Sequence, residues 1–277
     1  MYVLAPDSAS FGVDHKTNIH PTAIVHGGAK LGVGVTVGPF TLVGPKVTLH
    51  DNVHVGAHVV IGGRTSIGEG SRVWPFATLG SEPQDLKYKG DDTCLNIGPK
   101  NLIREYVNIS LGTMGGGGET AIGSGNLFMV NSHVAHDCFV GDNCVFANGT
   151  ALAGHVHIGS RVVLGGMAGV HQFCKVGDLA MLAGGAMVVQ DVMPFCIVHG
   201  DRARVKGLNT IGLTRAGFSK SQISSIKTMY RILVREHLSL TDAVKKVREE
   251  VGESTERDMI LKFVESSSRG FCRRADS

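Results

Sequence analysis

A six-residue repeat of apolar residues runs through most of this 277-residue chain. One run of eleven aliphatic residues steps by six from Ile19 to Leu79, and a second run of twelve apolar residues steps by six from Ile122 to Val188. Three isoleucines keep the same step between the two runs: Ile97, Ile103 and Ile109. A period of six matches neither an α-helical face nor the alternation of a simple strand. It is typical of a parallel β-helix, in which each flat face turns one apolar residue inward.

The repeat predicts the size of the coil and the places where the chain leaves it. Three faces of six residues make an 18-residue turn, so the 26 hexads predict about eight to nine coils over residues 18–199. Glycine makes up 38 of the 277 residues, roughly twice its usual share of about 7%, as many tight corners require. Polar or glycine-rich sequence interrupts the repeat at 80–96 and at 112–121. We expect both segments to leave the coil at corners, as loops that form a binding face.

The period changes towards the C-terminus, where apolar residues follow a helical spacing. Ser219 is a suitable N-cap for a first helix, Thr241 for a second, and a third helix is expected from about Thr255. The apolar faces of these helices would carry Ile223, Ile226, Tyr230 and Leu233, then Val244, Val247 and Val251, then Met259, Ile260, Phe263 and Val264. The sequence therefore predicts a small helical domain at 200–277, and it leaves residues 1–17 as an N-terminal extension.

Composition narrows the partners and the compartment. The net charge of +3 is too mild to indicate a nucleic-acid partner, which usually needs a clustered basic surface. The first residues contain no apolar secretory segment, and no apolar run approaches 18 residues, so we expect a cytoplasmic protein that does not span a membrane. The six cysteines form no C-x-x-C pair, which predicts free, reduced thiols.

Four histidines stand out because their spacing approaches one coil: His133, His136, His155 and His171. His155 follows His136 by 19 residues and precedes His171 by 16, so we expect these side chains along one edge of the coil, about 5 Å apart. Small residues surround them, which favours a pocket. Three interpretations compete: structural stacking, a metal site, and general-base catalysis. General-base catalysis is preferred, because glycine N–H groups beside the histidines could stabilise an oxyanion.

The segments around these histidines resemble a known enzyme family. In chain order they are Gln84-Asp85-Leu86-Lys87-Tyr88, Asn131-Ser132-His133-Val134-Ala135-His136-Asp137-Cys138, Leu152-Ala153-Gly154-His155-Val156, Val170-His171-Gln172-Phe173-Cys174 and Arg215-Ala216-Gly217-Phe218. Together they resemble the acyl-carrier-protein–UDP-N-acetylglucosamine O-acyltransferases, the first enzymes of lipid A synthesis, over residues 18–272. The resemblance implies a left-handed β-helix and a homotrimer with active sites between subunits.

The same resemblance implies a reaction. A 3-hydroxyacyl chain would pass from acyl carrier protein to the 3-hydroxyl of UDP-N-acetylglucosamine, without a covalent acyl-enzyme. No cofactor is expected, since the phosphopantetheine of the carrier protein supplies the acyl group, and no metal is expected either. The carrier protein and the sugar nucleotide are thus the expected partners.

The resemblance also implies residue roles. His136 would be the general base and Asp137 would orient it, although neighbouring strand residues normally point in opposite directions. The N–H of Gly154 would donate to the oxyanion. The expected substrate-binding residues are Gln84, Asp85, Lys87, His133, His155, His171, Gln172, Asn209 and Arg215. The expected acyl-chain pocket contains Gly166, Met181 and Gly184.

Three residues depart from the family pattern, at positions where the family commonly has polar or charged side chains: Ser110, Ile211 and Ala216. We expect these losses at the nucleotide end, so the acceptor could instead be the 3-amino analogue of the sugar. Other functions stay open as well. They are an acetyl-CoA-dependent hexapeptide acetyltransferase, a metal-dependent hydratase, and a scaffold whose histidines only stack.

Overall fold

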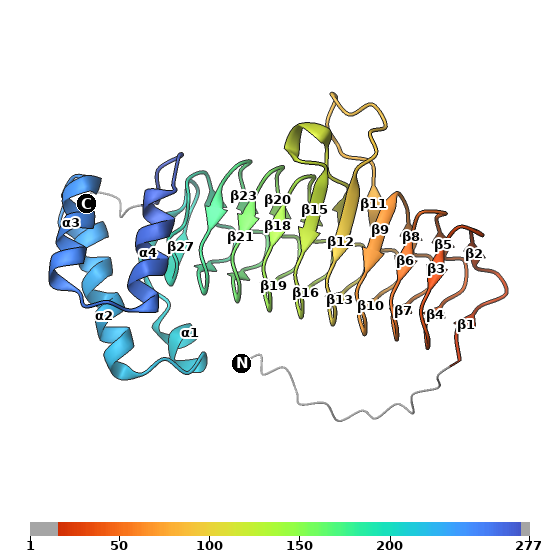
Figure 1. Cartoon of the computed structure of the whole chain (residues 1–277), viewed down its shortest axis with the longest axis horizontal. Helices are drawn as coiled ribbons and strands as arrows, with labels where there is room; N and C mark the ends of the chain where they lie inside the picture. Colours follow the sequence, from red (N-terminus) through yellow and green to blue (C-terminus); the bar gives the residue numbers. More distant parts are fainter. Residues whose placement is uncertain (1–15, 273–277) are drawn as a thin grey trace.

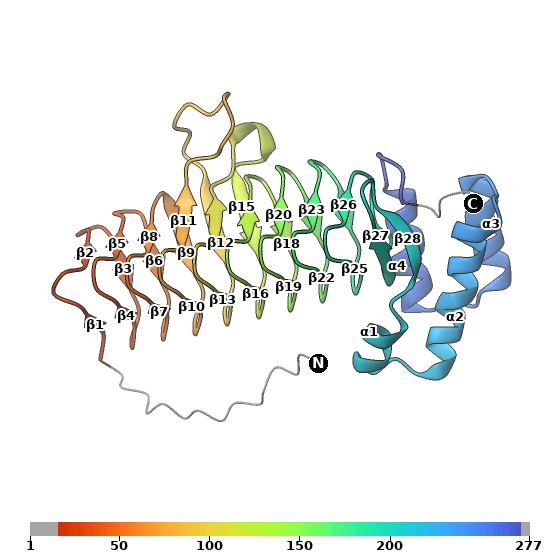
Figure 2. The same cartoon turned by 180° about the vertical axis from the view of Figure 1, so that it is seen from behind.

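The computed structural model describes residues 16–272 of the chain. The N-terminal extension expected at 1–17 thus lies outside the described residues, apart from its last two. Three parallel sheets form the sides of a long prism, and helices cover one of its ends (Figure 1). Figure 2 shows the same arrangement from behind.

Each sheet takes one strand from every coil. The 11-stranded sheet contains β1 (Asn18–Ile19), β4 (Thr36–Val37), β7 (His54–Val55), β10 (Arg72–Val73), β13 (Leu102–Ile103), β16 (Leu127–Phe128), β19 (Val145–Phe146), β22 (Val163–Leu164), β25 (Met181–Leu182), β27 (Cys196–His199) and β28 (Arg204–Leu208). The 9-stranded sheet contains β2 (Ile24–Val25), β5 (Leu42–Val43), β8 (Val60–Ile61), β11 (Thr78–Ser81), β14 (Asn108–Ser110), β17 (His133–Val134), β20 (Ala151–Leu152), β23 (Gly169–Val170) and β26 (Met187–Val188). The 8-stranded sheet contains β3 (Lys30–Leu31), β6 (Thr48–Leu49), β9 (Arg64–Ile67), β12 (Cys94–Ile97), β15 (Glu119–Ile122), β18 (Phe139–Val140), β21 (His157–Ile158) and β24 (Lys175–Val176).

The hexad register is confirmed by strand pairing and by burial. Thr36 pairs with His54, which lies 18 residues further along the chain. All twelve residues of the second apolar run, from Ile122 to Val188, are buried in one continuous core. Ile19 begins the first run but is 41% exposed, because no coil lies below the first one. One apolar residue per face per coil therefore builds the interior of the prism.

Two insertions leave the prism from a single edge. Arg72 pairs with Leu102, a separation of 30 residues and so twelve more than one coil. Asn108 pairs with His133, a separation of 25 and so seven more than one coil. Both insertions join a strand of the 9-stranded sheet to a strand of the 8-stranded sheet, and we call the edge between these sheets the loop edge (Figures 1 and 2).

Both loops are shorter than the sequence predicts. The first runs over 82–93 between β11 and β12, and the second over 111–118 between β14 and β15. A short 3-10 helix, Met114–Gly116, lies within the second loop. Strand pairing extends into the polar residues at both ends of each segment, so the break in the apolar repeat overestimated the loops.

The β-structure also continues past residue 199, where a helical domain was expected to begin. β28 runs antiparallel to β27 and extends the 11-stranded sheet to Leu208. A short helix that the sequence did not predict, α1 (Thr210–Arg215), follows it. The described residues include no helix that is long and apolar enough to cross a membrane.

The three predicted helices are present. α2 (Lys220–Tyr230) begins after Ser219, which forms a capping box with Gln222, and the chain then continues as one π-helical turn, Arg231–Arg235. α3 (Leu240–Glu250) is capped by Ser239 and not by Thr241, because the Ser239 hydroxyl accepts the N–H of Asp242. α4 (Thr255–Glu265) begins after Ser254.

Candidate active site

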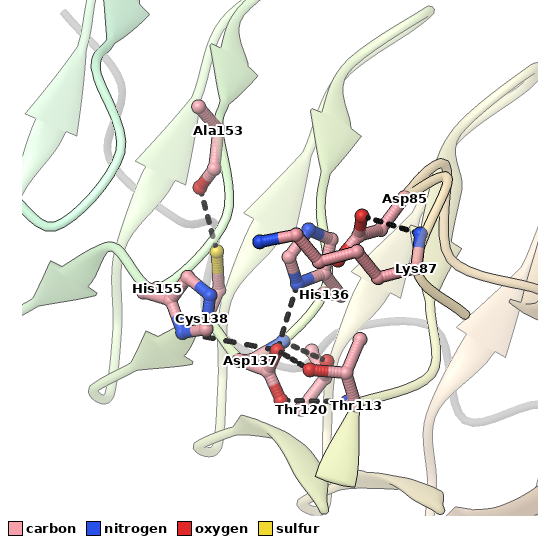
Figure 3. A network of polar contacts seen from close by, with 9 residues as sticks. All are labelled: Asp85, Lys87, Thr113, Thr120, His136, Asp137, Cys138, Ala153 and His155. Atoms are coloured by element: carbon pink, nitrogen blue, oxygen red, sulfur yellow. Dashed lines mark hydrogen bonds and ion pairs between the residues drawn. The ribbon is translucent and has the colours of Figure 1, made fainter. Parts of the chain in front are cut away.

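The loop edge brings His136 and Asp137 together in the corner between β17 and β18 (Figure 3). Asp137 has a φ of +59°, so it is a left-handed corner residue and not part of a strand. The alternation of strand side chains therefore does not apply to this pair. Nδ1 of His136 lies 2.7 Å from Oδ2 of Asp137. The corner thus supplies the orientation that strand alternation would have prevented.

The carboxylate of Asp137 is fully buried, with 0% of its side chain exposed, and it is well supplied with donors. The Thr113 backbone N–H donates to Oδ1 over 2.7 Å, and the Thr113 hydroxyl donates to Oδ2 over 2.6 Å. The Asp137 N–H in turn donates to the Thr120 hydroxyl over 2.9 Å. A buried charge is tolerated when hydrogen bonds replace its hydration. These contacts therefore suit an ionised Asp137 that acts only as an acceptor.

An ionised Asp137 sets the tautomer of its neighbour. Because the carboxylate accepts, Nδ1 of a neutral His136 carries the ring proton and Nε2 keeps its lone pair. The His136 side chain is 15% exposed, so the ring is reachable from outside. This arrangement can remove a proton from a hydroxyl that docks at the loop edge.

Gly154 lies directly against His136. A Cβ at this position would stand 2.6 Å from Cε1 and 2.8 Å from Nε2 of the imidazole, so only glycine lets the ring adopt this place. The Gly154 N–H donates to no acceptor within residues 16–272. A free backbone donor beside a candidate base is what an oxyanion site needs.

The histidines do not form one ladder, so that prediction is wrong. The rings of His136 and His155 make an edge contact at 5.1 Å, but the next ring on the corner is Phe173, stacked on His155 at 4.5 Å. His171 instead is exposed, and its Nδ1 contacts the carbonyl oxygen of Gln172 at 3.2 Å. Steps of 19 and 16 residues each shift the side chain within an 18-residue coil, and Phe173 takes the place expected for His171.

His133 lies on β17, one strand position before the corner. Its Nδ1 donates to Oδ1 of Asn108 over 2.9 Å, and Asn108 donates to the Ser81 hydroxyl over 3.1 Å. Burial is the main cause that lowers the pKa of His133, and the nearby His136 lowers it further. Outside His133 on the same face stand Ala151 and Gly169, whose small size leaves that side of the ring open.

The first loop contributes to the same site from within the same chain. Asp85 Oδ1 accepts the N–H of Lys87 over 3.0 Å, and Figure 3 draws both side chains beside the His136 network. Gln84 is exposed at the start of this turn. The loop therefore brings a carboxylate and an ammonium group to the candidate base.

Two predicted substrate-binding residues are not brought to this site. The side chain of Asn209 caps α1: Oδ1 accepts the Gly212 N–H over 3.0 Å, and Nδ2 donates to the carbonyl oxygen of Leu179 over 2.9 Å. Arg215 is exposed at the end of α1, which lies away from the loop edge in both views (Figures 1 and 2). Within one chain, the residues expected at the nucleotide end are thus separate from His136.

The predicted acyl-chain residues also lie elsewhere in the single chain. Gly166 and Gly184 lie at the edge between the 11-stranded and 9-stranded sheets, and Met181 is on β25. A Cβ at Gly184 would lie 3.5 Å from the carbonyl oxygen of Gly166, an ordinary contact, so the glycine leaves space for a neighbour. Their role in binding an acyl chain stays a prediction.

The three departures from the family pattern do not cluster, contrary to expectation. Ser110 is buried on β14 next to the second loop. Ile211 is 66% exposed on α1, and Ala216 is the C-cap of the same helix. Only the last two can affect a surface near Arg215.

The same three groups that form the candidate base could also hold a metal ion. His136, Asp137 and His155 each offer one ligand atom, and these atoms lie within 4.8 Å of one another. Two histidines and a carboxylate are a known ligand set for divalent transition metals. However, Oδ2 of Asp137 already accepts the Thr113 hydroxyl, so a metal would have to displace existing hydrogen bonds.

Sequence reasoning missed three residues of the site: Asn108, Thr113 and Phe173. Thr113 stands two positions before the run Gly115–Gly118, and a polar residue beside such a run was the one available signal. The other two have no local signal, because their contacts come from neighbouring coils.

Comparison with known proteins agrees with this geometry. Residues 191–272 match the family model for domain 2 of UDP-N-acetylglucosamine O-acyltransferase, and residues 46–81 match the bacterial transferase hexapeptide model. An acyl-[acyl-carrier-protein]–UDP-N-acetylglucosamine O-acyltransferase of Myxococcus xanthus is 51% identical over 92% of this chain and 99% of its own length.

Solved structures agree as well. The UDP-N-acetylglucosamine O-acyltransferase of Moraxella catarrhalis superimposes with a TM-score of 0.90 at 40% identity, over 92% of this chain and 99% of that one. The enzyme of Francisella novicida gives 0.91 at 36% identity, over 93% and 95%. These matches confirm the predicted fold class, a left-handed parallel β-helix followed by a small helical domain. The chain belongs to the acyl-[acyl-carrier-protein]–UDP-N-acetylglucosamine O-acyltransferase family.

Proposed function

We propose that this chain transfers a 3-hydroxyacyl group from acyl carrier protein to the 3-hydroxyl of UDP-N-acetylglucosamine, the first step of lipid A synthesis. The observation that carries the proposal is the His136–Asp137 pair. A buried acceptor 2.7 Å from Nδ1 leaves Nε2 as a base, directly beside the free N–H of Gly154. The names of the relatives supply the two substrates.

The proposed reaction is a direct transfer. Nε2 of His136 takes the proton of the sugar hydroxyl while the oxygen attacks the thioester carbonyl. The Gly154 N–H donates to the oxyanion that forms. When the C–S bond breaks, the protonated His136 returns its proton to the departing thiolate. Ester and free thiol result, and no cofactor takes part.

A covalent acyl-cysteine is not proposed, because the nearest thiol is unsuited to attack. Cys138 follows the His136–Asp137 pair, but its thiol is buried and donates to the carbonyl oxygen of Ala153 over 3.1 Å. Burial raises the pKa of this thiol to about 12. A thiolate at this position is therefore scarce near neutral pH.

We further propose a homotrimer in which each site uses two subunits. The support is the position of Arg215, which a single chain places on a different part of the prism from His136. A second copy could bring its own Arg215 to the loop edge of the first. The cytoplasmic location expected from the sequence stays a prediction.

Mixed subunits test this shared site. Neither His136→Ala nor Arg215→Ala should be active alone. After the two variants are unfolded together and refolded in equal amounts, about a quarter of the sites would pair an intact His136 with an intact Arg215 of the neighbour. Recovery of roughly that fraction of wild-type activity is expected. Absence of any recovery from well-folded mixed trimers would contradict a shared site.

The direct test of the reaction offers hydroxyacyl carrier proteins of several lengths to the purified protein together with UDP-N-acetylglucosamine. Transfer is expected, and His136→Ala should lower its rate by about 10²- to 10⁴-fold with the fold intact. Acetyl-CoA with the same sugar is the matched alternative donor. Transfer from acetyl-CoA alone would contradict the proposal.

A metal-dependent hydratase is the second candidate, because His136, Asp137 and His155 could act as ligands. It predicts about one zinc or iron ion per chain in the purified protein and loss of activity with a chelator. Acyl transfer that resists chelation would exclude it.

A further inference from the structure

The second loop holds the catalytic corner through one residue. Thr113 makes two of the hydrogen bonds to Asp137, one to each carboxylate oxygen, although it is 24 residues away in sequence. Thr113 belongs to the inserted segment 111–118 and not to the coil. Its own carbonyl oxygen accepts the N–H groups of Gly116 and Gly118, over 3.0 and 2.8 Å, which close the loop around it.

We propose that the 111–118 loop is a positioning device, in which Thr113 fixes the plane of the Asp137 carboxylate so that His136 receives its hydrogen bond. The inference rests on the proposed role of His136 as base. Thr113 would not touch the substrate; it acts through Asp137.

The need for such a device comes from a second histidine. Nδ1 of His155 lies 3.8 Å from the same Oδ2 that accepts from His136 at 2.7 Å. The terminal torsion of an aspartate is soft, so a carboxylate without further contacts can turn. A small rotation could transfer the acceptor from His136 to His155. Two donors from Thr113, one on each oxygen, oppose that rotation.

The glycine run of the loop serves the same contact. A Cβ at Gly116 would lie only 2.0 Å from Cγ of Asp137 and 2.2 Å from Oδ2, so the loop backbone packs directly on the carboxylate. Neighbouring Gly115 differs, because the nearest atom to its added Cβ would be the Thr113 hydroxyl at 4.0 Å. The loop thus covers Asp137 from water at one glycine and leaves the adjacent glycine free.

Thr113→Val tests the hydroxyl alone. Valine keeps the backbone N–H bond to Oδ1 and removes the donor to Oδ2. We expect kcat to fall about 10- to 100-fold, as for a lost hydrogen bond to a charged group, with KM for the sugar nucleotide little changed. Thr113→Ser keeps the donor and should retain kcat within about threefold. Equal losses in the two variants would overturn the inference.

A second measurement is independent of turnover. Histidine-selective ¹⁵N labelling reports which ring nitrogen of His136 is protonated, and the signal is assigned by its loss in His136→Gln. Wild type should show one tautomer with Nδ1 protonated, and Thr113→Val a mixture. An unchanged His136 spectrum in Thr113→Val would overturn the inference, whatever the activity. Should His136→Ala remain active while Thr113→Val alters the tautomer, the base assignment fails and the positioning contact stands.

The two adjacent glycines provide a matched pair in case Thr113→Val does not fold. Gly116→Ala should reduce kcat strongly because its methyl group meets the carboxylate, whereas Gly115→Ala should behave as wild type. Similar activity of the two variants would contradict a loop that acts through Asp137.

Discussion

Gly154→Ala tests the geometry of the corner most sharply. The added methyl carbon would stand 2.6 Å from Cε1 of His136, whereas carbon atoms pack best at about 3.5 Å or more. The imidazole must therefore move by about 1 Å, and a displacement of that size can cost about 100-fold in rate. The backbone at Gly154 is not in the left-handed region, so alanine itself is not strained there.

The assay is acyl transfer at saturating substrates, with thermal unfolding measured in parallel. Gly27→Ala is the control, because Gly27 occupies the equivalent hexad position at the same edge of the first coil, and its methyl group would meet nothing within 4 Å. We expect kcat of Gly154→Ala to fall about 100-fold and that of Gly27→Ala to stay at the wild-type value. Both variants should fold.

Either of two results would refute this reasoning. Wild-type kcat in Gly154→Ala would mean that the position of the His136 ring does not control the reaction. An equal loss in both variants would mean that any methyl group at this edge disturbs the coil, and the loss would then say nothing about His136.

Three further predictions concern stability and reactivity. Leu152 is fully buried, so Leu152→Ala should lower the free energy of unfolding by about 2–5 kcal/mol in denaturant titrations; a negligible loss would mean that the inward register is misassigned. Burial lowers the folded-state pKa of His133 below its ordinary 6.5, as it does for His54 and His157. Below about pH 6.5 the unfolded chain therefore binds protons that the folded chain does not, and stability falls as pH decreases. His133→Gln should reduce that dependence, and an unchanged slope would be evidence against it. Burial raises the pKa of Cys138, Cys144 and Cys196 to about 12, so iodoacetamide at pH 8 should leave these thiols unmodified in the native protein, as peptide mass spectrometry can check.

The interior of the fold was predictable because its signal is one-dimensional. One inward residue per six is enough to assign Val134, Leu152 and Val170 to the core without knowledge of any neighbour. The start of α2 was predictable for a similar reason, since Ser219 and Gln222 lie within one turn of each other.

The corner was harder, because its contacts depend on stacking between coils. The turn of Asp137 towards His136 follows from a left-handed φ, and the sequence does not mark which corner residue adopts it. Phe173 replaces His171 on the ladder because a shift of two residues changes which side chain meets His155. Thr113 reaches Asp137 through an inserted loop, and an insertion carries no register from which its contacts could be read.

The central claim is that His136 acts as the base in acyl transfer to a sugar nucleotide. The most direct measurement compares wild type and His136→Ala in transfer from hydroxyacyl carrier protein to UDP-N-acetylglucosamine and, in parallel, to its 3-amino analogue. We expect transfer to the hydroxyl sugar by the wild type and a loss of about 10²- to 10⁴-fold in the variant. Transfer by a folded His136→Ala trimer at the wild-type rate would contradict the account.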